Sequence, residues 1–170
     1  MNKIALVTGG TRGIGASISK KLSSNGIKVI ANFTSDENSA DKFSTVNNID
    51  VVKFDVSSFD ECKENVEIIK KKYGSIGILI NNAGITRDAA IHKMNVSQWQ
   101  EVINVNLNSA FNLVSNVIES MRENGFGRII HISSVNGQKG QFGQTNYAAS
   151  KAAIFGFSKS LALEVASKGI

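Results

Sequence analysis

Short apolar runs alternate with longer amphipathic stretches along the whole chain. Five runs are rich in Ile and Val and have the length of strands: IALVTGG at 4–10, IKVIANF at 27–33, IDVVKFD at 49–55, GILINNAG at 77–84 and GRIIHISS at 127–134. The longer stretches predict helices at 13–25, 35–46, 58–72, 97–124 and 147–168. Continuous apolar strands that alternate with helices are typical of a parallel sheet covered on both faces.

This alternation predicts the fold class directly. Crossover connections between parallel strands are right-handed, so five such units give an α/β, doubly wound, Rossmann-type sheet with strand order 3-2-1-4-5. No repeat, linker or low-complexity segment interrupts the pattern, and we expect one domain over residues 1–170. The longest helix is expected to begin at Ser97 and to end before Gly125.

Charge and composition narrow the class of protein. The net charge is +5, but the lysines are dispersed and form no continuous basic face, so nucleic acid is not an expected partner. Lys70, Lys71 and Lys72 fit the solvated end of a helix. No apolar run has the length of a membrane span or of a signal peptide. The single Cys62 excludes an internal disulfide and has no His or Cys partner nearby in sequence, and we expect a cytoplasmic protein without a metal site.

A glycine-rich turn follows the first strand and opens the first helix. It reads Thr8-Gly9-Gly10-Thr11-Arg12-Gly13-Ile14-Gly15. Glycines at this place let the backbone approach a pyrophosphate, and the helix N-terminus offers free N–H groups. A glycine turn without a ligand is the alternative interpretation, and a phosphate loop of the NTPase kind is excluded because no Gly-Lys-Ser/Thr follows.

The end of the second strand bears on the choice of nucleotide. An acidic residue there would accept the ribose hydroxyls of NADH, but this chain has Asn32-Phe33-Thr34-Ser35. Asp36 and Glu37 come later, where they suit a helix N-terminus. Arg12 is placed to pair with a 2′-phosphate, so we expect NADPH as the cofactor.

Tyr147 and Lys151 stand four residues apart in SSVNGQKGQFGQTNYAASK, at 133–151. This spacing places both side chains on one helix face, and a nearby ammonium makes a phenol a better acid. Helix capping by the tyrosine and a solvated lysine are the structural alternatives. His92 and His131 lack an acidic partner in sequence, and we interpret both as structural.

Taken in order, these motifs resemble those of the short-chain dehydrogenase/reductase family. The matching positions are the glycine pattern at 8–15, Asp55-Val56, Asn81-Asn82-Ala83-Gly84, Asn106, Ser134 and Tyr147-x-x-x-Lys151. The resemblance implies an NADPH site formed by Gly9, Thr11, Arg12, Gly13, Ile14, Gly15, Asp55, Val56, Asn82, Ala83, Gly84, Tyr147 and Lys151. It also implies that Ser134 binds the substrate carbonyl, Tyr147 acts as general acid, Lys151 holds the nicotinamide ribose and Asn106 positions a water.

Two further segments are similar to the acetoacetyl-CoA reductases of polyhydroxybutyrate synthesis. They are NNAGITRDAAIHKM at 81–94 and VNGQKGQFGQTNY at 135–147. This resemblance implies reduction of acetoacetyl-CoA to (R)-3-hydroxybutyryl-CoA, with the acyl-CoA thioester contacted by Asp88, Lys93, Gln141, Phe142, Gln144 and Thr145. The alternative substrate is a 3-oxoacyl group on acyl carrier protein. These residues could also simply shape the loop.

The resemblance also implies more chain than is present here. Family members continue past the Tyr-Lys helix with a sixth strand, a Pro-Gly loop, a substrate lid and a seventh strand, and they form homo-tetramers. We therefore expect a C-terminally truncated reductase, and the absence of proline agrees with this. The expected consequences are an exposed fifth strand, weak or absent activity and surviving dinucleotide binding. A non-catalytic remnant that at most binds a dinucleotide is the alternative from another class.

Overall fold

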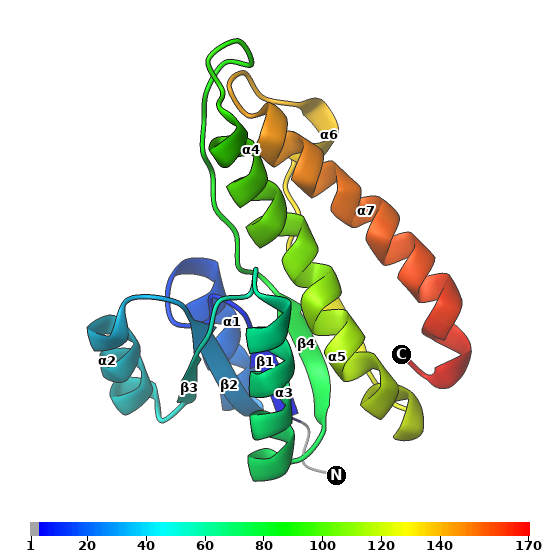
Figure 1. Ribbon diagram of the computed structural model, residues 1–170. Helices are drawn as coiled ribbons and strands as arrows, with labels where there is room; N and C mark the ends of the chain where they lie inside the picture. Colours follow the sequence, from blue (N-terminus) through cyan, green and yellow to red (C-terminus); the bar gives the residue numbers. More distant parts are fainter. Residues whose placement is uncertain (1–3) are drawn as a thin grey trace.

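The computed structural model describes residues 4–170 and contains one five-stranded parallel sheet (Figure 1). Its strands are β1 (Ile4–Val7), β2 (Lys28–Phe33), β3 (Asp50–Lys53), β4 (Ile76–Asn81) and β5 (Arg128–His131). Every neighbouring pair is parallel and the order is β3-β2-β1-β4-β5, which confirms the predicted topology.

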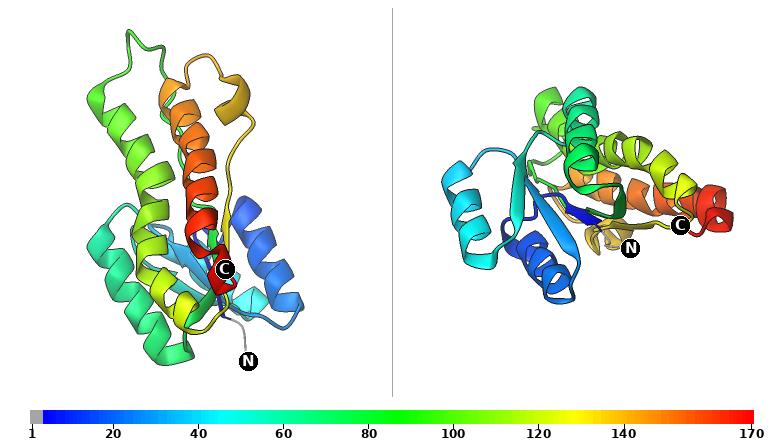
Figure 2. Two further views of the ribbon diagram at one scale, coloured as in Figure 1. Left: turned by 90° about the vertical axis from the view of Figure 1, so that its right-hand side faces the viewer. Right: turned by 90° about the horizontal axis from the view of Figure 1, so that it is seen from below.

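Helices cover both faces of the sheet. They are α1 (Gly13–Ser24), α2 (Glu37–Asn47), α3 (Phe59–Tyr73), α4 (Val96–Ile103), α5 (Ser109–Glu123), α6 (Asn136–Lys139) and α7 (Thr145–Val165). One apolar core joins the sheet to α3 and α5, with α7 packed at its margin, and a second joins it to α1 and α2. Figure 2 shows these two layers from below the sheet. Among the described residues, no helix is both long enough and apolar enough to span a bilayer.

The structure corrects the predicted single helix over 97–124. It begins earlier, because Asn95 caps α4 and forms a capping box with Gln98, so Ser97 is not the cap. It is also divided, because residues Asn104–Asn108 form the π-helix η1 between α4 and α5. A π-turn holds one extra residue per turn and rotates the side chains that follow it, and such bulges often lie at functional sites.

Other boundaries differ by small amounts. The segment after β5, expected as a polar loop, contains the short helix α6, and the predicted last helix ends as α7 followed by the 3₁₀ turn η2 (Ala166–Lys168). Asp36 caps α2 by accepting the N–H of Ser39, as its position before the helix suggested. The three lysines at 70–72 lie in the last turn of α3, as expected.

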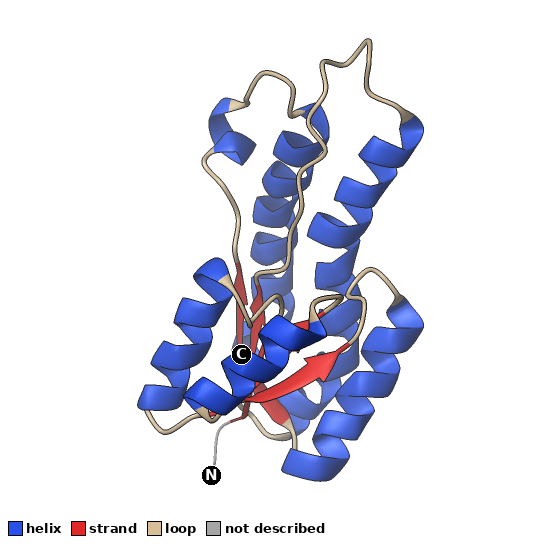
Figure 3. Cartoon of the chain, turned by 90° about the vertical axis from the view of Figure 1, so that its left-hand side faces the viewer, coloured by secondary structure: helices blue, strands red, loops and turns tan. Residues whose placement is uncertain are grey.

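The segments that follow β4 and β5 rise together beyond the sheet. Residues 82–95 and 132–144 run side by side to the first turns of α4 and α7 (Figures 1 and 3). The backbone joins them where the N–H of Ala89 donates to the carbonyl of Gly143 at 2.9 Å. This places residues far apart in the sequence at the carboxyl ends of the strands, where doubly wound sheets bind their ligands.

Candidate active site

The glycine loop between β1 and α1 is closely packed on the end of β4. Gly9 has a φ of 57°, a left-handed conformation that favours glycine. A Cβ on Gly15 would overlap the carbonyl oxygen of Gly9 and lie 2.6 Å from Nδ2 of Asn82. The Asn82 amide in turn donates to the carbonyl of Thr8 at 2.8 Å. The loop therefore follows a path that side chains at these glycines would obstruct, as a cradle for a pyrophosphate requires.

Three charged residues lie near the start of α1, where the expected choice between NADPH and NADH depends on charge. Arg12 precedes the first helical residue and is exposed. A hydrogen bond to Ser39, with a smaller contribution from Arg12, lowers the pKa of the Asp36 carboxyl. Glu37 pairs with Lys53 at 2.6 Å. Both acids are thus engaged at the start of α2, while the guanidinium of Arg12 has no ion-pair partner among residues 4–170.

Tyr147 and Lys151 lie in the first turns of α7, as the spacing predicted. Nζ of Lys151 is 5.8 Å from the ring centre of Tyr147 and donates to the carbonyl of Ile132 at 2.7 Å. Lys151 is only 5% exposed, and this burial lowers the pKa of its ammonium group. The structure therefore brings a buried ammonium group beside the Tyr147 ring.

The π-helix presents Asn106 to the same region. Its Oδ1 accepts the N–H of Ile85 at 2.8 Å, and its Nδ2 donates to the carbonyl of Ile85 and to Oγ of Ser150. A Cβ on Gly84 would lie 3.3 Å from Oδ1 of Asn106 and 3.6 Å from Nζ of Lys151. Asn106, Gly84 and Lys151 therefore surround one point at the carboxyl end of β4.

The two serines after β5 have different roles in the structure. Oγ of Ser133 donates to the carbonyl of Lys151 at 2.7 Å and so attaches α7 to the strand. Oγ of Ser134 accepts the N–H of Asn136 at 3.2 Å, which leaves its own hydroxyl hydrogen free to donate. This difference favours Ser134 as the group that binds a carbonyl oxygen.

The expected substrate residues fall into two groups. Gln144 is the central member of a network, since its Nε2 donates to Asp88 at 2.8 Å and its Oε1 accepts from Asn136 at 2.9 Å. Thr145 contacts the sulfur of Met94 at 3.7 Å. Lys93, Gln141 and Phe142 are exposed, Phe142 to 89%. Asp88, Gln144 and Thr145 thus make contacts within the protein that join neighbouring segments. Lys93, Gln141 and Phe142 are exposed and available to a ligand.

Asn146 is a residue of this region that sequence reasoning missed. It is fully buried, and its Nδ2 donates to the carbonyls of Arg87 and Gln98, both at 3.0 Å. Its Oδ1 accepts the N–H of Tyr147 at 2.7 Å. Asn146 therefore fixes the start of α7 against two other segments and sets the position of Tyr147.

His131 is the last residue of β5 and lies near Lys151 of α7. Its Nδ1 is 3.1 Å from the amide nitrogen of Asn81, and its ring packs edge-on against Phe157 at 5.3 Å. Burial, and then the charge of Lys151, lower the pKa of His131 to about 4. Its Nε2 is buried without a hydrogen-bond partner among the described residues, which fits a neutral, structural ring.

We expect this histidine to make the fold sensitive to acid. The unfolded chain takes up a proton near pH 6.5 and the folded chain only near 4, so the free energy of unfolding falls as the pH drops through that window. Solvent screening of the half-buried ring limits the loss to about 1–2 kcal/mol. Urea unfolding at several pH values measures it, and His131→Asn should remove this part of the dependence. An unchanged acid dependence in the variant would contradict the assignment.

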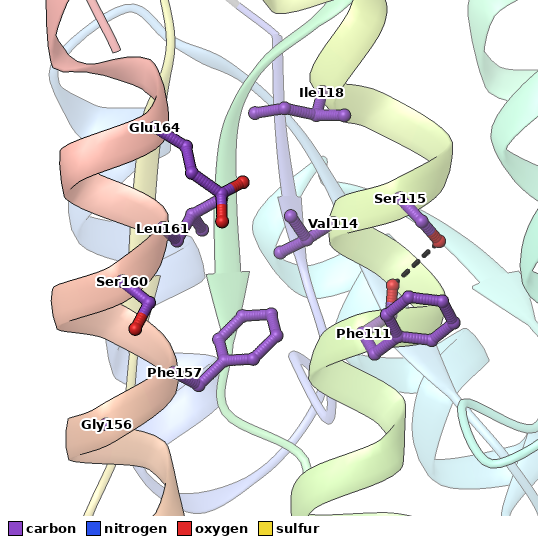
Figure 4. Close-up of a pocket in the computed structure, with 9 residues that line it drawn as sticks. All are labelled: Phe111, Val114, Ser115, Ile118, Gly156, Phe157, Ser160, Leu161 and Glu164. Carbon is purple, nitrogen blue, oxygen red and sulfur yellow. Dashed lines mark hydrogen bonds between the residues drawn. The ribbon is translucent and has the colours of Figure 1, made fainter.

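A cleft in the described chain lies elsewhere. It measures about 490 Å³ and separates α5 from α7, with the side chains of Phe111, Val114, Phe157 and Leu161 in its walls (Figure 4). Phe157 and Leu161 lie more than one helical turn beyond Lys151 along α7, and Phe111 and Val114 lie on α5. The cleft is therefore distinct from the cluster around Tyr147, which is defined by its polar groups.

A family profile described as short chain dehydrogenase matches residues 3–170. The chain belongs to the short-chain dehydrogenase family. Membership makes it an oxidoreductase by class and implies a nicotinamide dinucleotide as cofactor. The glycine cradle, the N-terminus of α1 and the buried ammonium of Lys151 fit such a cofactor.

Curated relatives of this short-chain dehydrogenase match it from end to end. An acetoacetyl-CoA reductase of Shinella zoogloeoides is 51% identical over 170 residues, which are 100% of this chain and 70% of the relative. An acetoacetyl-CoA reductase of Rhizobium meliloti is 50% identical with the same coverage. A 3-oxoacyl-[acyl-carrier-protein] reductase FabG of Escherichia coli is 46% identical over 99% of this chain and 69% of the relative.

Proposed function

We propose that this short-chain dehydrogenase reduces acetoacetyl-CoA to (R)-3-hydroxybutyryl-CoA with NADPH. The observation that carries the proposal is the buried ammonium of Lys151 beside the ring of Tyr147, next to Asn106. The names of the relatives at 51% and 50% identity support the choice of substrate.

Each residue of this cluster has a role in the proposed reaction. NADPH supplies the hydride that C3 of the substrate receives. Ser134 donates its hydroxyl hydrogen to the C3 carbonyl oxygen, and Tyr147 delivers a proton to that oxygen. Lys151 keeps a positive charge near the phenol, and its burial makes that charge effective because little water screens it. Asn106 holds the Ile85 backbone beside the reacting groups.

The cofactor site extends from the glycine loop to the end of β3. We assign the pyrophosphate to Gly9, Thr11, Gly13, Ile14 and Gly15, the adenine to Asp55 and Val56, and the nicotinamide ribose to Asn82, Ala83, Gly84, Tyr147 and Lys151. Arg12 would pair with the 2′-phosphate and so favour NADPH over NADH.

The residues expected at the substrate site suit a small thioester. Asp88 and Gln144, together with Thr145, would form the polar wall of the acyl site, and Lys93 and Gln141 would lie near its entrance. Phe142 is exposed and offers an apolar ring to a short acyl chain. The relative from Escherichia coli favours acyl carrier protein as the second candidate carrier of the 3-oxoacyl group.

The proposal is tested by NADPH oxidation with acetoacetyl-CoA, run beside acetoacetyl-acyl carrier protein and beside NADH. We expect a higher kcat/KM for the CoA thioester and for NADPH. Arg12→Ala should raise the KM for NADPH about tenfold, the typical effect of losing one charged phosphate contact, and leave the KM for NADH nearly unchanged. Nucleotide binding without turnover would favour the non-catalytic remnant instead.

A further inference from the structure

Asn112 on α5 reaches out of its own helix to the loop that follows β3. Its Nδ2 donates to the carbonyl of Val56 at 3.0 Å and to the carbonyl of Ser57 at 3.2 Å. Asn112 is 6% exposed, and α5 lies beside α3, at the start of which this loop ends (Figure 1). The side chain thus links two elements that are more than fifty residues apart in the sequence.

Residues of α3 and of the loop itself make further contacts with this loop. Sγ of Cys62 lies 3.4 Å from the carbonyl of Val56, and the Val56 side chain is buried in the core. The Asp55 N–H donates to Glu61, while Oδ1 of Asp55 accepts the N–H and the hydroxyl of Ser57. These bonds hold the backbone of the loop in place.

Two polar atoms of the loop stay free. Neither Oδ2 of Asp55 nor the N–H of Val56 bonds to any residue between 4 and 170. An acceptor beside a donor matches the edge of an adenine ring, which offers an amino group next to a ring nitrogen. The Val56 carbonyl that Asn112 holds shares its peptide plane with the Ser57 N–H, and this N–H donates to Oδ1 of Asp55, so the contact bears on how the Asp55 carboxylate is oriented.

We propose that Asn112 is a positioning residue for the adenine half of the cofactor site. The inference rests on the proposed function, since it requires that Asp55 and Val56 contact adenine. By holding the Val56 and Ser57 carbonyls, Asn112 fixes the two peptide planes that follow Val56, and the first of these carries the Ser57 N–H that holds the Asp55 carboxylate. Asn112 lies on the far side of the loop and does not itself touch the nucleotide.

The role differs from general support of the fold. Removing the amide leaves the Ser57 carbonyl without a donor among residues 4–170 and the Val56 carbonyl with only the Cys62 thiol, a change that backbone shielded from water tolerates poorly, and the loop relaxes to find other partners. That relaxation displaces Asp55 and Val56 but leaves Tyr147 and Lys151, which lie on α7, in place. The expected signature is therefore a loss confined to ligands that contain adenine.

The test uses Asn112→Leu, which keeps the branching and the number of side-chain heavy atoms and removes both donors. Calorimetric titration compares adenosine 2′,5′-bisphosphate, which occupies the adenine half, with reduced nicotinamide mononucleotide, which occupies the other half. We expect binding of the adenosine ligand to weaken about tenfold and binding of the mononucleotide to stay unchanged. Asn116→Leu is the matched control, because Asn116 lies one turn later on α5 and bonds only to the Asn112 carbonyl of its own helix.

The outcomes separate the inference from the function on which it rests. An equal loss for both ligands would reduce Asn112 to a general stabilising residue and overturn the inference, as would unchanged binding of the adenosine ligand. If the wild-type chain bound neither ligand, the proposed cofactor site would fail and the inference with it. Wild-type binding that Asn116→Leu preserves and Asn112→Leu selectively weakens is the result that supports it.

Discussion

Replacing Tyr147 by phenylalanine is expected to lower kcat for acetoacetyl-CoA reduction by about 10³-fold, the usual contribution of a well-placed general acid. The phenol is the group beside the buried ammonium of Lys151, and phenylalanine keeps the ring while removing its proton. The Tyr147 N–H still donates to Asn146, so the start of α7 keeps its position. Initial rates of NADPH oxidation at saturating thioester measure the effect.

A control for this variant is binding of adenosine 2′,5′-bisphosphate. This ligand occupies the half of the site that is distant from Tyr147, and we expect its affinity to be the same in both proteins. Turnover of Tyr147→Phe at the wild-type rate would remove Tyr147 from the reaction and favour another donor. A parallel loss of nucleotide binding would instead indicate that the substitution disturbs the fold.

Replacing Gly15 by alanine is expected to abolish nucleotide binding and to lower the free energy of unfolding by about 3 kcal/mol, as overpacking against backbone does. The added methyl group would overlap the carbonyl oxygen of Gly9 and approach the amide of Asn82 to 2.6 Å. Neither neighbouring atom can move easily, because one is a backbone oxygen and the Asn82 amide is itself bonded to the Thr8 carbonyl. The glycine loop must therefore move away from α1. Urea unfolding and titration with NADPH measure the two effects.

Gly156→Ala is the matched control for this substitution. Gly156 is also a helical glycine, but a Cβ on it would meet no atom within 4 Å. Alanine in a helix interior restricts the unfolded chain and should stabilise the protein by about 0.5–1 kcal/mol. Equal effects of the two substitutions would show that helix propensity, and not the close approach of Gly9, determines the result at Gly15.

The sheet was predictable because its strands are short, continuous apolar runs in the sequence. Runs such as IALV at 4–7 are buried on both faces, and the handedness of the crossovers then leaves a few doubly wound strand orders, of which β3-β2-β1-β4-β5 is one. The family motifs likewise stand at the ends of strands, where polar residues interrupt apolar ones. Local patterns therefore contained enough information for the fold and for most of the expected site.

The features that were missed depend on contacts between distant segments. The π-helix was missed because the stretch from residue 97 to 124 reads as continuous helix, with no glycine or proline to mark an interruption. Asn146 follows a polar loop and looks like any residue before a helix, yet its partners are 48 and 59 positions away. Asn95 and Ser97 are both plausible caps, and only the reciprocal bond of Gln98 distinguishes them.

The asparagine amides of the site have a thermodynamic consequence. Loops are often ordered by proline, which restricts the unfolded chain and so acts through entropy, but this chain contains no proline. Here amides at 32, 82, 106, 112 and 146 hold backbone carbonyls of segments beyond their own element. Such bonds exist only in the folded state, and a loop cannot open without breaking them. The loops around the site therefore belong to the same cooperative unit as the sheet, and heating would melt both in one transition.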